Sequence, residues 1–191
     1  MSRVKINKKY LDSTIAFTQS SGTYKDPYQP RGNVIYKLKN KVQTFTSLRS
    51  IENEFVDFRT YHLQNQFRDI YSDLAMAYKR ADKVILNRSL SQQMYEYSQA
   101  LLKDKKPTPF QKTVNGLTLL QARIYANQDH LLPEDQWAQI TMRFDLSDQD
   151  GERLRQYNVF ERRLSDKLSF YDWKLCYQGT DQEFNLLHKS E

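Results

Sequence analysis

The spacing of apolar residues predicts a helical first part of the chain and a second part built of strands. From Ile51 to Tyr78, apolar and aromatic side chains recur at steps of three and four residues, through a stretch that holds neither glycine nor proline. This period is typical of an amphipathic helix with one face toward a core. We therefore expect one long helix between these two residues, with Ser50 as its N-cap and Glu52 and Glu54 in its first turn.

Two shorter helices are predicted after the long one. The helical period restarts over residues 83–90, and again after Ser89 or Ser91 as far as about Lys103. The following segment, residues 103–109, is rich in lysine and proline and ends the helical part of the chain.

Beyond this segment the apolar period falls to two, which is typical of strands with one buried face. An Asp-Gly pair at residues 150–151 favours a hairpin turn between the second and third strands, so these two strands are expected to run antiparallel. The predicted strands are residues 117–126, 138–144, 157–164 and 173–177.

Together these elements predict an α+β domain, in which a cone-shaped antiparallel sheet packs on the long helix and the two shorter helices. We place this domain at residues 51–178, with a short tail over residues 179–191. Residues 1–50 mix Ser, Thr, Gly, Pro, Asn and Lys with isolated apolar side chains. This composition buries too little apolar surface to offset the entropy of ordering, so residues 1–50 are predicted to be an extended arm that orders on a partner.

Charge separates the arm from the domain. The chain has 29 Lys and Arg against 23 Asp and Glu, a net charge of +6, and residues 1–50 alone hold ten basic and two acidic residues, a local charge of +8. Such an arm favours nucleic acid or an acidic membrane surface, because neutralising phosphates releases counterions; the alternative is a merely solvated tail. The residues expected to contact RNA are Arg3, Lys5, Lys8, Lys9, Lys25, Arg31, Lys37, Lys39 and Lys41.

A second group of basic residues lies where the long helix meets the first short one. One interpretation is an anion or lipid contact, and the other is a solvated helix end, where cations also favour the C-terminal dipole. The group consists of Lys79, Arg80, Lys83 and Arg88.

The sequence carries no recognisable catalytic or metal-binding motif. The histidines, His62, His130 and His188, have no Cys, His or Asp at the spacing of a zinc or iron site, and the five glycines are too scattered for a phosphate loop. The lone cysteine, Cys176, excludes an intrachain disulfide and is expected to be a buried thiol in a strand. We therefore expect no metal, no cofactor and no enzymatic activity.

One enzymatic alternative stays open, in which the interior of the cone is a substrate pocket with Asp145 and Tyr125 as proton shuttles. No run of about eighteen apolar residues occurs, so no helix is expected to span a bilayer.

Three segments in the same order resemble the Tim-like domain. Residues 70–91 are similar to its opening, where a helix ends in a turn of small residues and Asp before a short helix and a Leu-Ser step. Residues 157–164 and 173–176 are similar to its final pair of strands, where Phe-Glu-Arg and Trp-x-Leu recur. This domain is shared by the mitochondrial import-motor scaffold and mitochondrial large-subunit ribosomal proteins of the L-forty-five type.

The resemblance implies a nuclear-transport-factor-like cone and a partner-binding role in the mitochondrial matrix, peripheral at the inner membrane. A basic arm before the domain favours the ribosomal branch of the family, which holds ribosomal RNA and neighbouring proteins near the exit tunnel. We therefore expect a structural constituent of the mitochondrial large ribosomal subunit, with rRNA and ribosomal proteins as partners in a large hetero-assembly. The alternative is an inner-membrane adaptor, either an import-motor component or an accessory subunit of a respiratory-chain complex, that meets anionic lipid or a membrane protein.

Overall fold

The computed structural model describes residues 34–104, 110, 113–126, 136–147, 151–164 and 173–180, apart from the side chains of residues 36, 125, 126, 136 and 180. The predicted arm over residues 1–33 and the tail from residue 181 onward lie outside these ranges. The described helices are α2 (Val34–Glu54), the 3-10 helix η2 (Thr60–His62), α3 (Leu63–Lys79), α4 (Lys83–Ser89) and α5 (Gln92–Lys103). The described strands are β1 (Thr113–Ala126), β2 (Gln136–Ser147), β3 (Arg153–Arg163) and β4 (Lys174–Thr180).

The prediction of the first helix was wrong in two respects. Residues 34–50 are helical and not extended, and α2 runs without a break across the predicted domain boundary, so Ser50 lies inside a helix and caps nothing. The predicted long helix is also interrupted, because α2 ends at Glu54 and α3 begins only at Leu63. Phe55 and Phe58 in the connection are fully buried, and their spacing continued the helical period across the break.

The two shorter helices are confirmed, and each begins at a side-chain cap. The carboxylate of Asp82 accepts hydrogen bonds from the amides of Val84 (3.0 Å) and Ile85 (3.2 Å) at the start of α4. The hydroxyl of Ser91 accepts from the Met94 amide (3.4 Å) at the start of α5. Such caps satisfy amides that have no partner within the helix.

The four predicted strands are confirmed as one antiparallel sheet with the order β1-β2-β3-β4, so the chain is of the α+β class. The strands are longer than predicted: β1 begins at Thr113, β3 begins at Arg153, and β4 continues to Thr180, past the predicted end of the domain at residue 178. Gly151, with φ 79°, precedes β3 in a conformation that favours glycine.

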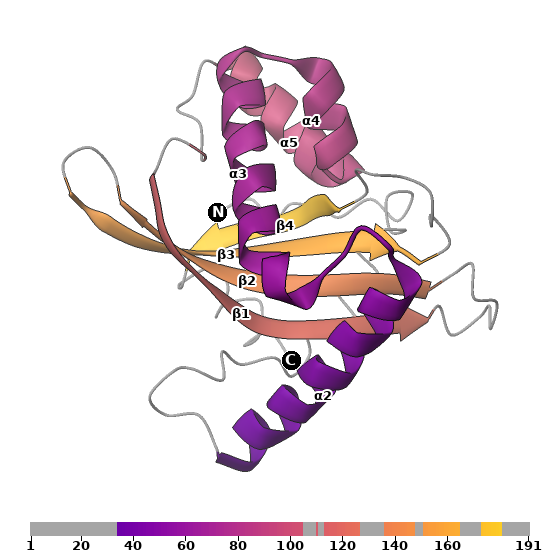
Figure 1. Ribbon diagram of the computed structural model, residues 1–191. Coiled ribbons are helices and arrows are strands. Elements are labelled where there is room, and N and C mark those ends of the chain that lie inside the picture. The colour runs from indigo at the N-terminus through magenta and orange to yellow at the C-terminus, as the bar shows by residue number, and fades with distance from the viewer. Residues whose placement is uncertain are drawn as a thin grey trace, which may run out of the picture.

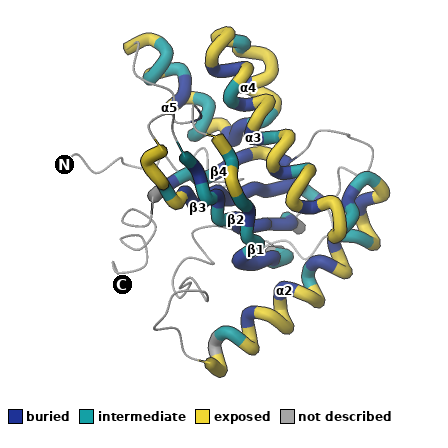
Figure 2. The backbone as a smooth tube through the Cα atoms, turned by 60° about the vertical axis from the view of Figure 1, so that its left-hand side comes forward, coloured by how far each residue is buried: buried dark blue, intermediate teal, exposed yellow. Residues whose placement is uncertain are grey.

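The main hydrophobic core lies between α3 and one face of the sheet. Phe67, Tyr71 and Leu74 of α3 are buried in one cluster with Ile140 of β2 and Phe160 of β3. In Figure 1, α3 crosses in front of the strands, whereas α4 and α5 lie together beyond β4. Figure 2 shows that most of the described strand residues are buried or half-buried, whereas α2, α3 and α4 expose long stretches.

The predicted final pair of strands is confirmed. β3 and β4 are adjacent and antiparallel, with Phe160 paired to Leu175. Trp173, immediately before β4, is 3% exposed. Its ring centroid lies 6.3 Å from that of Phe55, 5.7 Å from that of Phe58 and 5.4 Å from that of Phe67.

Helix α2 lies along β1, the outermost strand on its side of the sheet (Figure 1). The amide nitrogen of Asn40 donates to the carbonyl oxygen of Leu120 (2.8 Å), and the hydroxyl of Thr44 accepts from the amide of Ala122 (3.4 Å). Polar side chains of α2 thus bind backbone groups of β1, while Leu48 and Ile51 of the same helix join the main core.

At the other edge of the sheet, the link between α4 and α5 contacts β4. The amide of Ser91 donates to the carbonyl oxygen of Leu175 (3.0 Å), next to an isolated parallel bridge between Leu90 and Leu175. Both outermost strands are therefore bonded to a segment from the helical part of the chain.

Candidate partner-binding surfaces

The outer face of α2 carries a group of exposed, large apolar side chains. The side of α2 that contacts β1 is formed by Asn40, Thr44, Leu48 and Ile51, which are buried. Because an α-helix turns once in 3.6 residues, the apolar residues at positions 34, 35, 38, 42 and 45 fall on the other side of the helix from these four. The outer face, as we call it from here on, consists of Val34 (77% exposed), Ile35 (74%), Leu38 (63%), Val42 (56%) and Phe45 (66%).

Three of the predicted RNA-binding residues lie on the same helix. Lys39 and Lys41 are exposed, and Lys37 is half-buried. α2 has no acidic residue before Glu52, so its first four turns carry only positive charge. The other predicted RNA-binding residues, Arg3, Lys5, Lys8, Lys9, Lys25 and Arg31, lie outside the described residues.

The second basic group lies around the turn between α3 and α4. Lys79, Arg80 and Lys83 are exposed there, and Arg88, also exposed, follows in the last turn of α4. The turn is made by Ala81, whose φ of 51° is left-handed, and the amide of Asp82 donates back to the carbonyl of Ala77 (2.8 Å).

Two features of this turn bear on the two interpretations. Val84, directly after Lys83, is 78% exposed, so an apolar side chain accompanies the cations. Lys79 and Arg80 also stand at the C-terminal end of α3, where cations are favourable without any ligand. Both interpretations of the sequence therefore remain open.

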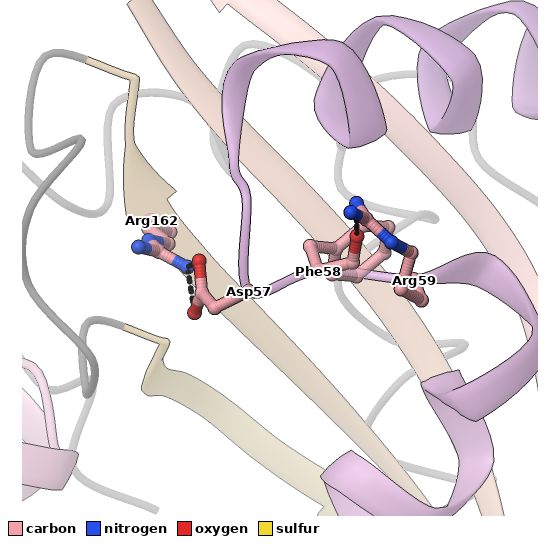
Figure 3. A network of polar contacts seen from close by, with 4 residues as sticks. All are labelled: Asp57, Phe58, Arg59 and Arg162. Atoms are coloured by element: carbon pink, nitrogen blue, oxygen red, sulfur yellow. Dashed lines mark hydrogen bonds and ion pairs between the residues drawn. The ribbon is translucent and has the colours of Figure 1, made fainter.

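A buried ion pair joins the α2–α3 connection to β3, as Figure 3 shows. Nη1 of Arg162 donates to both carboxylate oxygens of Asp57, at 2.9 and 2.8 Å, and Cζ lies 3.8 Å from the ring centroid of Phe55. The Arg162 side chain is 1% exposed and that of Asp57 is 22% exposed. Arg59, two residues further along, points away from the pair and donates to the carbonyl oxygen of Phe58 (3.0 Å). We interpret the Asp57–Arg162 pair as structural.

A buried carboxyl group lies on the sheet face opposite α3. Glu161 is 1% exposed, and its Oε1 accepts from the amide of Gln139 (2.9 Å) on the neighbouring strand. Burial raises the pKa of Glu161 to about 8, although the Gln139 amide and the nearby Cys176 thiol act to lower it. Glu161 is therefore mostly protonated at neutral pH.

The expected burial of Cys176 is confirmed. The residue is 5% exposed, and its thiol donates to the carbonyl oxygen of Val159 (3.1 Å). Burial, together with the nearby Glu161, raises the pKa of the Cys176 thiol, which keeps it in the unreactive thiol form.

Among the described residues that were candidates for chemistry, Asp145 and Tyr125 lie near opposite ends of the β1–β2 pairing, Asp145 opposite Gly116 and Tyr125 opposite Trp137. Asp145 is 41% exposed and lies 3.6 Å from both Arg143 and Arg155, and the side chain of Tyr125 is outside the described part. His62 is exposed, with its ring centroid 4.2 Å from that of Tyr61. His130 and His188 also lie outside the described ranges.

The described part of the chain offers neither a metal-ligand cluster nor a helix that could cross a membrane. Its residues contain no group of three or more His, Cys, Asp or Glu side chains arranged to hold a metal ion. Within the same residues, every helix is too short or too polar to cross a bilayer.

No family model and no curated protein matches the chain. The resemblance to the Tim-like domain thus rests on residues 70–91, 157–164 and 173–176, and it remains a prediction.

Proposed function

We propose that the protein is a structural subunit of a large hetero-assembly, and specifically a constituent of the mitochondrial large ribosomal subunit. In this role it binds ribosomal RNA and neighbouring proteins near the exit tunnel, in the matrix and close to the inner membrane. The observation that carries the proposal is the outer face of α2, where five large apolar side chains are each more than half exposed.

The apolar surface supports an assembly role. Single exposed apolar side chains are normal on monomeric proteins, but a contiguous group of them rimmed by polar residues marks an interaction site. In α2 the group extends over three turns of one helix, while the opposite side of that helix is already occupied by β1. Binding of a partner would remove this surface from water.

The charge distribution supports RNA as one of the partners. Six predicted RNA-binding residues, from Arg3 to Arg31, precede α2 in the chain, and α2 adds Lys37, Lys39 and Lys41. Lysine and arginine side chains gain affinity for RNA by neutralising phosphates, independently of sequence. A basic segment joined to a domain with net charge near zero therefore suits a protein that anchors to rRNA.

We also propose that the domain has the cone-shaped, nuclear-transport-factor-like fold. The order of the elements, helices first and then an antiparallel sheet with α3 across one face, supports a fold of the nuclear-transport-factor-like type. In that arrangement the sheet and α3 form a rigid platform, and α2 and the α3–α4 turn present the surfaces for partners.

Co-sedimentation with purified mitochondrial large ribosomal subunits tests the proposal. The full chain should pellet with the subunits, and removal of residues 1–33 should weaken this association and its dependence on salt. The truncation stops before Val34 because α2 is bonded to β1 and belongs to the folded domain. A full-length protein that stays in the supernatant at low salt would show that the ribosomal assignment is wrong.

A second candidate function, an inner-membrane adaptor, is favoured by one observation. At the α3–α4 turn, exposed Lys79, Arg80 and Lys83 stand beside Val84, which is 78% exposed. Cations next to an apolar side chain suit an anionic bilayer surface, where each gains about 1 kcal/mol. Flotation with cardiolipin-containing liposomes tests it: binding that survives loss of residues 1–33 but is lost when the three cations are neutralised would support this function.

A further inference from the structure

We propose that the outer face of α2 binds an acidic amphipathic helix of a neighbouring protein, laid alongside α2 as in a two-stranded coiled coil. The inference rests on the proposed function in one respect, that α2 is an assembly surface, and it adds the chemistry of the partner.

The spacing of the outer face is that of a coiled-coil seam. Ile35, Leu38, Val42 and Phe45 follow one another at steps of three, four and three residues, and all are exposed. These are successive a and d positions of a heptad. Ile35 and Val42 at a with Leu38 at d are the combination that favours two strands, and Phe45 fills the second d position. A stripe of this width suits one partner helix, whereas a helix lying in a membrane presents a broader apolar face.

The charges beside the seam determine which partner fits. In the same heptad register Lys39 takes an e position and Lys41 a g position, on the two sides of the apolar stripe, and both are exposed. Charges at e and g select partners in coiled coils. A partner helix with Glu or Asp at its own e and g positions would meet them favourably. A second copy of this chain would bring lysines against lysines, because residues 34–51 contain no acidic side chain.

The length of the apolar stripe on α2 limits the affinity for a partner helix. From Ile35 to Phe45 the helix rises about 15 Å, or about three turns. An interface of this size lies at the small end of specific protein contacts, so we expect an isolated helix to bind with a Kd of about micromolar. Within an assembly, the other contacts of the protein raise the effective concentration of the partner and make such a seam sufficient.

Binding of designed peptides to the full chain tests the inference, with fluorescence anisotropy as the readout. The probes are two three-heptad helical peptides with Leu at a and d, one with Glu at e and g and the other with Lys there. The acidic peptide should bind at least tenfold more tightly than the basic one. The variant Lys39→Glu/Lys41→Glu should reverse this preference, and Phe45→Asp should weaken binding at least tenfold.

The matched control is Val56→Asp, the same kind of change at an apolar residue that is 82% exposed but lies outside the helix. It should leave peptide binding unchanged. Circular dichroism of each variant should match that of the unaltered protein, because the altered side chains are exposed.

Three outcomes would overturn the inference. Equal or absent binding of the two peptides would remove the acidic helix as the occupant. Binding to phosphatidylserine vesicles that Phe45→Asp abolishes would make the face a membrane contact, and a dimer that Phe45→Asp dissociates would make the occupant a second copy. If the protein pellets with ribosomal subunits but does not bind the acidic peptide, only this inference is refuted. If it binds the acidic peptide but does not pellet with ribosomal subunits, only the ribosomal assignment is refuted.

Discussion

At the scale of single residues, the least expected feature is the arginine in the interior. Arg162 lies in β3 with its side chain almost fully buried, and its charge is balanced by Asp57, 105 residues earlier in the chain. Phe55 packs against its guanidinium group. Because desolvation of both charges offsets much of their attraction, the pair fixes the position of the α2–α3 connection more than it adds stability.

Removing only one residue of the Asp57–Arg162 ion pair should lower the stability of the protein considerably. We expect Asp57→Ala to lower the free energy of unfolding by about 3 kcal/mol, because it leaves a buried guanidinium without its carboxylate. The double variant Asp57→Ala/Arg162→Met should lose less than the sum of the two single changes. Chemical denaturation of the four proteins measures this coupling. Arg59→Ala is the control, and an equal loss of stability in that variant would contradict the role of the ion pair.

Glu161 should make the stability of the domain depend on pH. Its pKa is raised from 4.5 to about 8 in the folded state, so the folded protein holds more protons than the unfolded chain between these values. The stabilisation from the protonated form is complete below about pH 4.5 and is lost as the pH rises through 8, with a slope of up to about 1.4 kcal/mol per pH unit.

The variant Glu161→Gln should remove this slope and be more stable than the unaltered protein at pH 8. Urea denaturation at pH 5, 6.5 and 8 measures it, with Glu96→Gln, an exposed carboxylate on α5, as the control. A slope that persists in Glu161→Gln would show that another group causes it.

Local roles could be predicted from the sequence only in part: Ser91 was one of the two expected starts of the second short helix, whereas the predicted cap Ser50 lies inside α2. Asp82 and Ser91 cap helices through amides two and three residues away, and the burial of Cys176 follows from its place in a strand. The Asp57–Arg162 pair and the bond between Gln139 and Glu161 depend on strand register and on the path of the α2–α3 connection. Neither can be read from spacing along the chain.

At the scale of the elements, Trp173 holds the helical part to the sheet. It contacts Phe55 and Phe58 before α3 and Phe67 within α3, while β4, which begins at the next residue, pairs with β3. The loop that carries the two phenylalanines is thereby fixed against the start of β4.

Removing this side chain should unfold much of the domain. We expect Trp173→Ala to cost about 3–5 kcal/mol, comparable with the stability of many small domains, and to abolish all associations of the protein. Thermal denaturation measures it. Tyr97→Ala, at an aromatic residue that is 55% exposed, should change the melting temperature little. A folded Trp173→Ala protein that has lost only its binding would instead mark Trp173 as a binding residue.

Helices and strands differed in how well their sequence patterns predicted them. In β2 the apolar residues Ala138, Ile140, Met142 and Phe144 alternate with polar ones, so its period is clear. α2 has apolar residues on two sides, one toward the core and one toward solvent, which hid its single-stripe pattern and led to the prediction of an extended arm. Phe55 and Phe58 continue the helical spacing between α2 and α3, although the chain there is not α-helical. Their burial in the core accounts for their apolar character.

At the scale of the whole molecule, positive charge is concentrated at the start of the chain and the sheet lies in the other part. Replacing Lys5, Lys8, Lys9 and Lys25 by Gln should therefore leave the melting temperature unchanged and weaken RNA binding. The magnitude of the slope of log affinity against log salt should fall by up to about 3.6, because each phosphate that is no longer neutralised removes about 0.7 to 0.9 from it.

Filter binding at several salt concentrations measures this slope. Neutralising Lys79, Arg80 and Lys83 instead is the control, and it should leave the RNA slope as it was. If the two sets of changes had the same effect, the RNA contact would not belong specifically to the start of the chain.

The bonds from Asn40 and Thr44 to β1 have a consequence for the behaviour of the isolated protein. An outermost strand with free amides and carbonyls is a template for pairing with other chains, and this is a common route to aggregation. α2 covers part of the edge of β1, and the Ser91 link occupies a carbonyl on β4. The helix that offers its outer face to a partner thus also protects the edge of the sheet. A truncation that removes part of α2 would therefore be expected to remove the proposed docking surface and to lower the solubility of the protein.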